Sequence, residues 1–207
     1  MKSKEKLLLF DYDGTIVDSI GYVLKSFNQA LKKYGFKETP MGKLRDIYKI
    51  NLYDSLIKIG IDEDILKSFL VDWVSYLEAY KGDIKVFEGM QETIEKLSDD
   101  FKVFVVTSNH TDFVFNCLKE FRFKGIDAVI GGDKGTSKSD KIKDLLKNKG
   151  YNEVFYIGDS LGDILESNKA GVKSVSVSWG IHSRRLLESG SPTYLVDKPE
   201  ELLDIFY

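Results

Sequence analysis

Four aspartates of this sequence stand in two spaced pairs that could share one chemical task. Asp11 and Asp13 lie two residues apart in Asp-Tyr-Asp-Gly-Thr, and Asp159 and Asp163 lie four apart in Gly-Asp-Ser-Leu-Gly-Asp. Each pair follows a short apolar run. Clustered carboxylates repel one another, and a hard cation such as Mg²⁺, which prefers oxygen ligands, relieves that repulsion. The two pairs therefore predict a magnesium site.

A hydroxyl and an ammonium accompany these carboxylates. Thr107 follows a third apolar run and precedes Ser108 and Asn109, and Lys138 stands just before a predicted helix. A metal cation and a lysine, with hydroxyl and backbone N–H donors beside them, form an environment for a phosphoryl group. The predicted chemistry is phosphoryl transfer. Within the first pair of aspartates, one carboxylate can attack phosphorus to form an aspartyl-phosphate, and the other can transfer protons.

These residues need a scaffold that brings the ends of distant strands together. Short apolar runs bounded by Asp, Gly, Ser or Asn predict buried strands, and they alternate with stretches of helical periodicity. That alternation predicts an α/β fold with a doubly wound, mostly parallel, Rossmann-like sheet. The predicted strands cover residues 7–10, 101–107, 127–130, 154–157, 174–177 and, at an edge, 193–196. Ligands bind at the carboxyl ends of such strands, where the candidate residues stand.

The helical stretches divide into two groups. Crossover helices are predicted over residues 90–97, 113–121, 142–146, 164–170, 183–188 and 200–206. The first strand is followed by about eighty residues with no convincing second strand, far more chain than the ~30 residues of a simple strand-helix-strand unit. Three helical stretches, 19–34, 43–59 and 63–80, occupy this insertion. They predict an all-helical cap subdomain over residues 19–85 and a core domain made of residues 1–18 and 86–207.

Composition excludes several other kinds of protein. The 207 residues are 43% hydrophobic, which is enough for a full core, and 30 basic against 33 acidic residues leave a net charge of -3. No positive field favours nucleic acid. The longest apolar runs fall short of the ~20 residues that span a bilayer, and the first residues do not resemble a signal peptide. The single cysteine, Cys117, fits a reducing cytoplasm. We expect a monomer or dimer that acts on a small molecule.

The ordered motifs resemble the haloacid dehalogenase superfamily of phosphohydrolases. The signature of that family is Asp-x-Asp-Gly-Thr on the first strand, then a Thr or Ser ending the second, a Lys, and Gly-Asp-x-x-x-Asp. In this sequence the matching residues are Asp11 to Thr15, Thr107, Lys138, and Gly158 to Asp163. The resemblance covers the whole chain in order and spacing, and the insertion stands where the family has its helical cap.

The resemblance implies a role for each matching position. Asp11 would be the nucleophile and a metal ligand. Asp13 would be the general acid/base and would offer its backbone carbonyl to Mg²⁺. Asp159 would be the third protein ligand of the metal, and Asp163 would orient a metal-bound water. The phosphoryl group would be bound by the remaining motif residues, namely Gly14, Thr107, Ser108, Asn109 and Lys138.

The resemblance also narrows the reaction. Dehalogenases of the family lack an acid at the position of Asp13, so its presence favours phosphate esters. The run from Gly14 to Ser19 and the helical insert resemble the branch that contains phosphoglycolate phosphatase and pyrophosphatase-like or nucleotidase-like members. One departure follows Lys138, where that branch usually has proline and this sequence has serine. Lys134 and Lys141 stay alternatives for the phosphate-binding lysine.

The resulting hypothesis is a Mg²⁺-dependent phosphatase that hydrolyses a small phosphate monoester, such as a phosphoglycolate-like compound, a nucleotide or a sugar phosphate, through an aspartyl-phosphate. One alternative is a phosphomutase of the same superfamily, which would pass the phosphoryl group to a second hydroxyl. Another is a non-catalytic phospho-acceptor module, because receiver domains also combine acidic residues, Mg²⁺, Thr and Lys. Receivers, however, are shorter and lack a helical insert.

Overall fold

The computed structural model describes residues 6–47, 56–134, 137–147 and 150–207. The chain divides into two compact units, one made of Met1–Val17 and Val86–Tyr207 and the other of Asp18–Lys85. The chain passes between them through β2 (Val17–Asp18) and β3 (Lys85–Val86), which pair as a two-stranded sheet. Within the ranges described, no helix combines the length and apolar character needed to cross a membrane.

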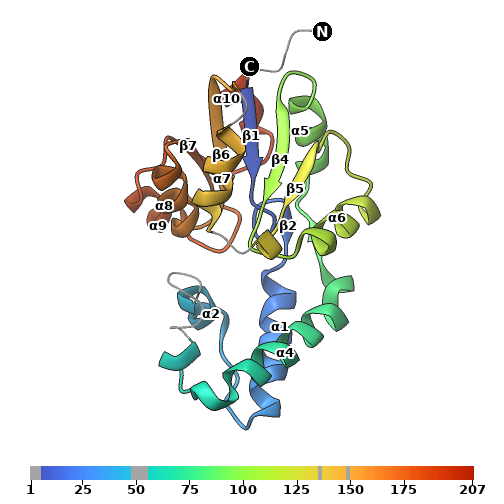
Figure 1. Cartoon of the computed structure of the whole chain (residues 1–207), viewed down its shortest axis with the longest axis vertical. Coiled ribbons are helices and arrows are strands. Elements are labelled where there is room, and N and C mark those ends of the chain that lie inside the picture. Colours follow the sequence, from blue (N-terminus) through green and yellow to red (C-terminus); the bar gives the residue numbers. More distant parts are fainter. Residues whose placement is uncertain (1–5, 48–55, 135–136, 148–149) are drawn as a thin grey trace. The chain divides into compact units, whose positions relative to one another are not determined.

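A six-stranded parallel sheet forms the centre of the first unit (Figure 1). Its strand order is β5-β4-β1-β6-β7-β8. The strands are β1 (Lys6–Phe10), β4 (Lys102–Val106), β5 (Ala128–Ile130), β6 (Glu153–Gly158), β7 (Lys173–Val177) and β8 (Tyr194–Val196). All six were expected from their apolar runs, and the predicted α/β fold with a mostly parallel sheet is confirmed. The two-residue strands β2 and β3 are too short to leave a pattern in the sequence.

The central strand β1 explains why a continuous apolar run marks a strand here. It pairs with β4 on one side and β6 on the other, and its four apolar residues, from Leu7 to Phe10, are fully buried. A strand covered on both faces needs no alternation of polar side chains. Leu7 and Leu9 join Tyr156 and Ile142 in the core on one face of the sheet.

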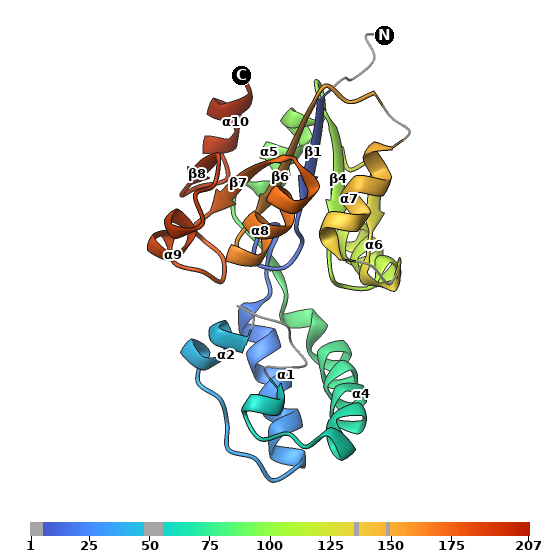
Figure 2. The same ribbon diagram turned by 60° about the vertical axis from the view of Figure 1, so that its left-hand side comes forward.

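Crossover helices cover the sheet. They are α5 (Met90–Leu97), α6 (Thr111–Glu120), α7 (Lys138–Leu146), α8 (Leu161–Ala170), α9 (Arg184–Ser189) and α10 (Glu201–Phe206), and η2 (Gly132–Lys134) is a short 3-10 turn. Helix α8 packs against β6, β7 and α7, and α10 packs against α5 (Figure 2). Helices α7 and α8 begin three or more residues earlier than predicted. Lys138 is the first residue of α7 rather than the residue before the helix, and α8 begins at Leu161, because Ser137 and Ser160 cap them.

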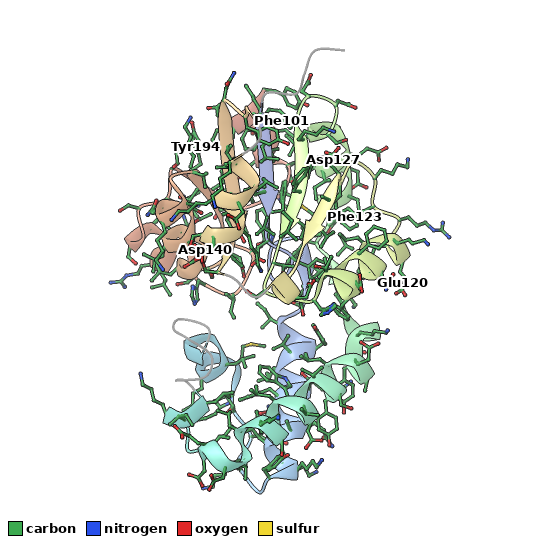
Figure 3. The ribbon with its side chains drawn as sticks, in the orientation of Figure 1. Phe101, Glu120, Phe123, Asp127, Asp140 and Tyr194 are labelled. Atoms are coloured by element: carbon green, nitrogen blue, oxygen red, sulfur yellow. The ribbon has the colours of Figure 1, made fainter. Side chains whose placement is uncertain are left out.

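Aromatic packing and hydrogen bonds stabilise the chain at the amino ends of β4 and β5. Phe101 and Asp127 directly precede β4 and β5 (Figure 3). The Phe101 ring lies 5.3 Å from that of Phe206, and Asp127 Oδ2 accepts a hydrogen bond of 3.0 Å from the Val103 amide. Candidate site residues instead follow the carboxyl ends of the strands.

The second unit is helical. It contains α1 (Ile20–Lys33), α2 (Met41–Ile47), α4 (Glu63–Tyr80) and the 3-10 turn η1 (Lys81–Asp83). Its core is aromatic: Trp73 packs edge-on against Phe27 with ring centroids 5.0 Å apart, and its indole N–H donates to Ser26 Oγ at 3.0 Å. Of the predicted helix over residues 43–59, residues 48–55 lie outside the described residues.

Candidate active site

Three neighbouring strands deliver the candidate residues to one edge of the sheet. Asp11 follows β1, Thr107 follows β4 and Asp159 follows β6, and these strands are adjacent in the order β4-β1-β6. All three side chains are buried. Parallel strands end at the same edge of a sheet, so residues almost 150 positions apart in sequence become neighbours.

A carboxylate cluster lies at this edge. Asp11, Asp159 and Asp163 are all buried, and one carboxylate oxygen from each lies within 4.8 Å of the others. Burial and mutual repulsion both oppose the charged forms of such groups. Burial, opposed by Lys138 and reinforced by Asp163, raises the pKa of Asp11 to about 7. Burial and then repulsion from Asp163 and Asp11 raise the pKa of Asp159 well above its usual range. The cluster is short of positive charge.

Lys138 supplies one cation to the cluster. Its Nζ lies 2.8 Å from Asp11 Oδ2 and 2.7 Å from Asp163 Oδ1. Burial opposes the charge on Lys138, but the two carboxylates outweigh burial and hold the pKa of the lysine well above its usual range. The first turn of α7 positions this residue. Ser137 Oγ accepts from the Asp140 amide, and Glu166 Oε2 accepts from the Ser139 amide at 2.8 Å.

Asp13, whose charge also acts on Asp11, is held by a side chain from the loop after β4. Asn109 Nδ2 donates to Asp13 Oδ2 at 2.6 Å, and the Asn109 amide donates to Thr107 Oγ1 at 3.1 Å. Asn109 therefore links the Thr107 loop to the Asp13 carboxylate. Sequence reasoning placed Asn109 at the phosphate, and the structure shows that it also orients Asp13.

The Asp159 carboxylate lies in a cradle of backbone. Ile181 N donates to Asp159 Oδ2 at 2.6 Å, and Thr15 Oγ1 lies 3.5 Å from Asp159 Oδ1. A Cβ at Gly14 or Gly180 would overlap with Asp159 Oδ2. Gly14 also has a φ of +72°, in the left-handed region that favours glycine. Both glycines therefore make room for this carboxylate.

Asp163 has two tasks in the structure. Its Oδ2 accepts hydrogen bonds from the Ser160 amide and hydroxyl and completes the capping box of α8, while its Oδ1 faces Lys138. A carboxylate near a helix N-terminus also interacts favourably with the helix dipole. The motif Gly-Asp-x-x-x-Asp therefore combines a strand end with a capped helix start.

Of the two alternative lysines, Lys141 makes a different contact from Lys138. Lys141 Nζ donates to the backbone carbonyl of Thr107 at 2.9 Å rather than to a carboxylate of the cluster. The side chain of Lys134 lies outside the described residues. Of the residues predicted to bind phosphate, Ser108 is exposed and Gly14 is buried beside Asp159.

The sequence matches a known family over most of its length. The family model of haloacid dehalogenase-like hydrolases covers residues 8–177. The chain belongs to the haloacid dehalogenase-like hydrolases. The predicted family and the predicted hydrolase class are thereby confirmed.

Individual relatives of this haloacid dehalogenase-like hydrolase match it over nearly its whole length. A protein of Caldanaerobacter subterraneus subsp. tengcongensis, provisionally named pyrophosphatase PpaX, is 30% identical over 96% of this chain and 93% of its own length. A Bacillus cereus pyrophosphatase PpaX is 27% identical over 98% of this chain and 96% of its own. The structure of a haloacid dehalogenase-like family hydrolase from Streptococcus pneumoniae has the same fold, with a TM-score of 0.87, 23% identity, and coverage of 97% and 98% of the two chains.

Sequence reasoning missed the loop after β7 in this haloacid dehalogenase-like hydrolase. Gly180 and Ile181 contact Asp159, and Trp179 Nε1 donates to the Thr15 carbonyl at 3.1 Å. His182 Nδ1 accepts from the Leu161 amide at 2.9 Å and so supports the start of α8. A signal was available, since this loop also follows the carboxyl end of a predicted strand.

Proposed function

We propose that this chain is a Mg²⁺-dependent phosphatase that hydrolyses a small phosphate monoester through an aspartyl-phosphate at Asp11. The observation that carries the proposal is the placement of the Asp11 carboxylate. It lies in a buried acidic cluster and 2.8 Å from the ammonium of Lys138. A nucleophile beside both a candidate cation site and a lysine suits an incoming phosphoryl group, whose negative charge both cations would neutralise.

The buried carboxylates fit a magnesium ion. Asp11 and Asp159 would hold it together with the backbone carbonyl of Asp13, and Asp163 would orient a water bound to it. Oxygen donors and an excess of buried negative charge are what Mg²⁺ requires. When bound, Mg²⁺ supplies charge neutralisation and Lewis-acid polarisation of the phosphoryl oxygens.

The first chemical step transfers the phosphoryl group to the enzyme. A carboxylate oxygen of Asp11 forms a bond to phosphorus while the bond from phosphorus to the leaving oxygen breaks. Asp13, in its protonated form, donates a proton to that oxygen, and the alcohol departs. The hydrogen bond from Asn109 to Asp13 Oδ2 holds this carboxyl group in place.

The second step returns the enzyme to its starting state. Asp13, now a carboxylate, accepts a proton from water as the water oxygen bonds to phosphorus. The bond between phosphorus and the Asp11 oxygen breaks, and inorganic phosphate leaves. Lys138, Thr107 and the loop residues Ser108 and Gly14 are proposed to bind the phosphoryl oxygens through both steps.

The relatives' names and the motif suggest which substrates to test. Two relatives are named pyrophosphatase PpaX. Pyrophosphate therefore joins phosphoglycolate-like compounds, nucleotides and sugar phosphates as a substrate to test.

We also propose that Asp18–Lys85 acts as a cap that excludes bulk water during the reaction. The cytoplasmic location and the monomeric or dimeric state stay predictions.

Phosphate release from a panel of small phosphate esters and pyrophosphate tests the proposal. The wild-type chain, with and without Mg²⁺, is compared with Asp11→Asn, and Asp144→Asn on the exposed side of α7 is the matched control. We expect turnover only with Mg²⁺, a loss of at least about 10³-fold in Asp11→Asn, and wild-type activity in Asp144→Asn. Circular dichroism checks that Asp11→Asn is folded.

The alternatives give different results in the same assay. Phosphate release that requires an activating sugar bisphosphate would indicate a phosphomutase. A stable phosphoprotein without turnover would indicate a phospho-acceptor module. Near-normal activity in folded Asp11→Asn would refute the aspartyl-phosphate mechanism.

A further inference from the structure

Lys141 is a buried cation that the proposed mechanism does not use. It is the fourth residue of α7, one turn after Lys138, and its side chain is 5% exposed. No ion pair among the described residues includes its ammonium, whereas Lys138 pairs with two carboxylates. Burying an ammonium without a carboxylate opposes folding, and an apolar side chain would fill the same space without this cost. The charge therefore contributes little to holding the fold together.

The ammonium contacts the backbone of the loop that follows β4. Lys141 Nζ donates to the Thr107 carbonyl at 2.9 Å, and hydrogen bonds from charged donors are stronger than neutral ones. Thr107 is 1% exposed, and its hydroxyl accepts from the Asn109 amide. The loop over residues 107–109 is thereby held at a carbonyl and at a hydroxyl.

Holding a carbonyl also orients the next amide. The described backbone has no cis peptide bond, and in a trans peptide the C=O and N–H groups point in opposite directions. The Ser108 N–H therefore points away from Lys141. Among the described residues it donates to no protein acceptor, and Ser108 is exposed. An amide fixed in this way is a ready donor to an anion.

The charge of Lys141 belongs to the same electrostatic environment as the cluster. Burial and then repulsion from Lys138 lower the pKa of Lys141, while Asp133 and Asp11 oppose that shift. The lysine lies on the carbonyl side of the Thr107–Ser108 peptide, and the Ser108 N–H points to the other side. A buried positive charge there favours a phosphoryl group bound at the N–H, because attraction between opposite charges is strong where water is excluded.

We propose that Lys141 is a positioning residue for the phosphate-binding loop. Its ammonium holds the Thr107 carbonyl, so that the Ser108 N–H is directed at the phosphoryl group, and it adds positive charge behind the loop. This inference rests on the proposed phosphatase function. It assigns Lys138 and Lys141 separate tasks, one at the carboxylates and one at the loop.

Inhibition by inorganic phosphate tests the inference. Lys141→Met removes the charge and the donor at nearly constant side-chain length, and Lys143→Met makes the same charge change on an exposed residue of the same helix. We expect the inhibition constant of phosphate to rise about tenfold in Lys141→Met, equivalent to about 1.4 kcal/mol, and to change less than about twofold in Lys143→Met. In Lys141→Met, KM should rise together with the inhibition constant, whereas the Mg²⁺ concentration for half-maximal activity should stay the same.

A purely structural role would give a different pattern. Lys141→Met should unfold close to the wild-type temperature, because removal of a buried charge offsets the loss of the hydrogen bond to the Thr107 carbonyl. Lys141→Arg should restore most of the phosphate affinity. A lowered unfolding temperature with an unchanged inhibition constant would overturn the inference, as would equal constants in Lys141→Met and Lys143→Met. If Lys141→Met fails to fold, Lys141→Gln and Lys141→Arg decide: equal phosphate affinities in the two would refute a role for the charge.

Failure of the proposed phosphatase function can be distinguished from failure of the inference about Lys141. Calorimetric titration with inorganic phosphate in the presence of Mg²⁺ measures binding without turnover. If the wild-type chain hydrolyses no ester, the proposed function fails, and the titrations of wild type and Lys141→Met still test the lysine. If the wild-type chain is active and both titrations agree, only the inference about Lys141 fails.

Discussion

Single side chains at the strand ends determine what this site can do. Asp11 lies beside two other buried carboxylates and pairs with Lys138, whereas the Asp13 carboxylate accepts a hydrogen bond from Asn109. Two carboxylates two residues apart thus occupy different environments. The proposed mechanism assigns these two carboxylates different roles, those of nucleophile and of general acid/base.

The hydrogen bond from Asn109 to Asp13 leads to a prediction about leaving groups. Asn109→Ala removes this donor, so we expect kcat for an alkyl phosphate to fall roughly tenfold and kcat for p-nitrophenyl phosphate to fall much less, since an aryl oxygen leaves without a proton. Asp13→Asn should show the same pattern with a loss of about 10²–10⁴. The measurement is kcat across esters of increasing leaving-group pKa. Asn168→Ala, on the exposed side of α8, is the control, and equal losses on both kinds of ester would contradict the assignment.

Gly14 leads to a prediction about the metal site. In Gly14→Ala the added Cβ overlaps with Asp159 Oδ2 at a positive φ, so we expect the Mg²⁺ affinity to fall about 10–100-fold. Gly35→Ala is the matched control, because Gly35 has a similar φ of +77° but no atom near the added Cβ. It should cost about 1–2 kcal/mol of stability and leave the Mg²⁺ dependence unchanged. Titration of activity with Mg²⁺ compares the two, and an unchanged Mg²⁺ dependence in Gly14→Ala would argue against Asp159 as a ligand.

At the scale of elements, the N-terminal ends of two helices position the site residues. Helix α7 begins at Lys138 and α8 begins two residues after Asp159, so helix caps and site residues share the same short segments. The predicted helices over 142–146 and 164–170 began too late because periodicity of apolar residues does not report a polar first turn. The serines at positions 137 and 160 were the available signals.

The capping box of α8 predicts a loss of both stability and activity. Ser160→Ala removes the hydroxyl that bonds the Asp163 amide and carboxylate, so we expect a loss of about 1 kcal/mol and a lower kcat, as Asp163 is no longer held. Ser183 precedes α9 without a side-chain cap bond, so Ser183→Ala should change little. Urea denaturation with parallel assays compares the variants. A loss of stability equal in both variants would show that the cap does not matter.

At the scale of the whole molecule, burial of the carboxylate cluster sets a pH dependence. The pKa of Asp11 is about 7 in the folded chain against an ordinary value of 3.8. Between these values the folded state binds more protons than the unfolded state, so stability falls as pH rises through this window. Ligands that bind only the folded state add stability, and Mg²⁺ at the proposed site would compete with the protons.

Thermal unfolding across pH measures this effect. Without Mg²⁺ we expect the midpoint to fall by a few degrees between about pH 4 and pH 7, and saturating Mg²⁺ to raise it more at pH 7 than at pH 5. Asp11→Asn should show a smaller fall, since one of the titrating groups is gone. An identical pH dependence in Asp11→Asn, or a Mg²⁺ effect of the same size at both pH values, would contradict a carboxylate metal site.

Much of this protein follows from its sequence alone. The strands were predictable because a fully buried strand needs an unbroken apolar run, as in Leu7 to Phe10, and the family was predictable because four motifs stand in order. The two-residue strands β2 and β3 could not be predicted, since a pair of residues shows no periodicity. Gly180 and Ile181 stand after a predicted strand, but their side chains carry no chemistry that marks a site. Lys141 was a candidate, but its residue type alone could not separate its role from that of Lys138.

Only the tertiary structure decided the contacts between these motifs. It placed Lys138 rather than Lys141 at Asp11, joined Asn109 to Asp13, and brought the loop after β7 against Asp159. Residue types and spacing along one strand are local properties that a sequence shows directly. Which of two lysines one helical turn apart reaches a carboxylate depends on the packing of α7 against the sheet, and that is set by residues far away in the chain.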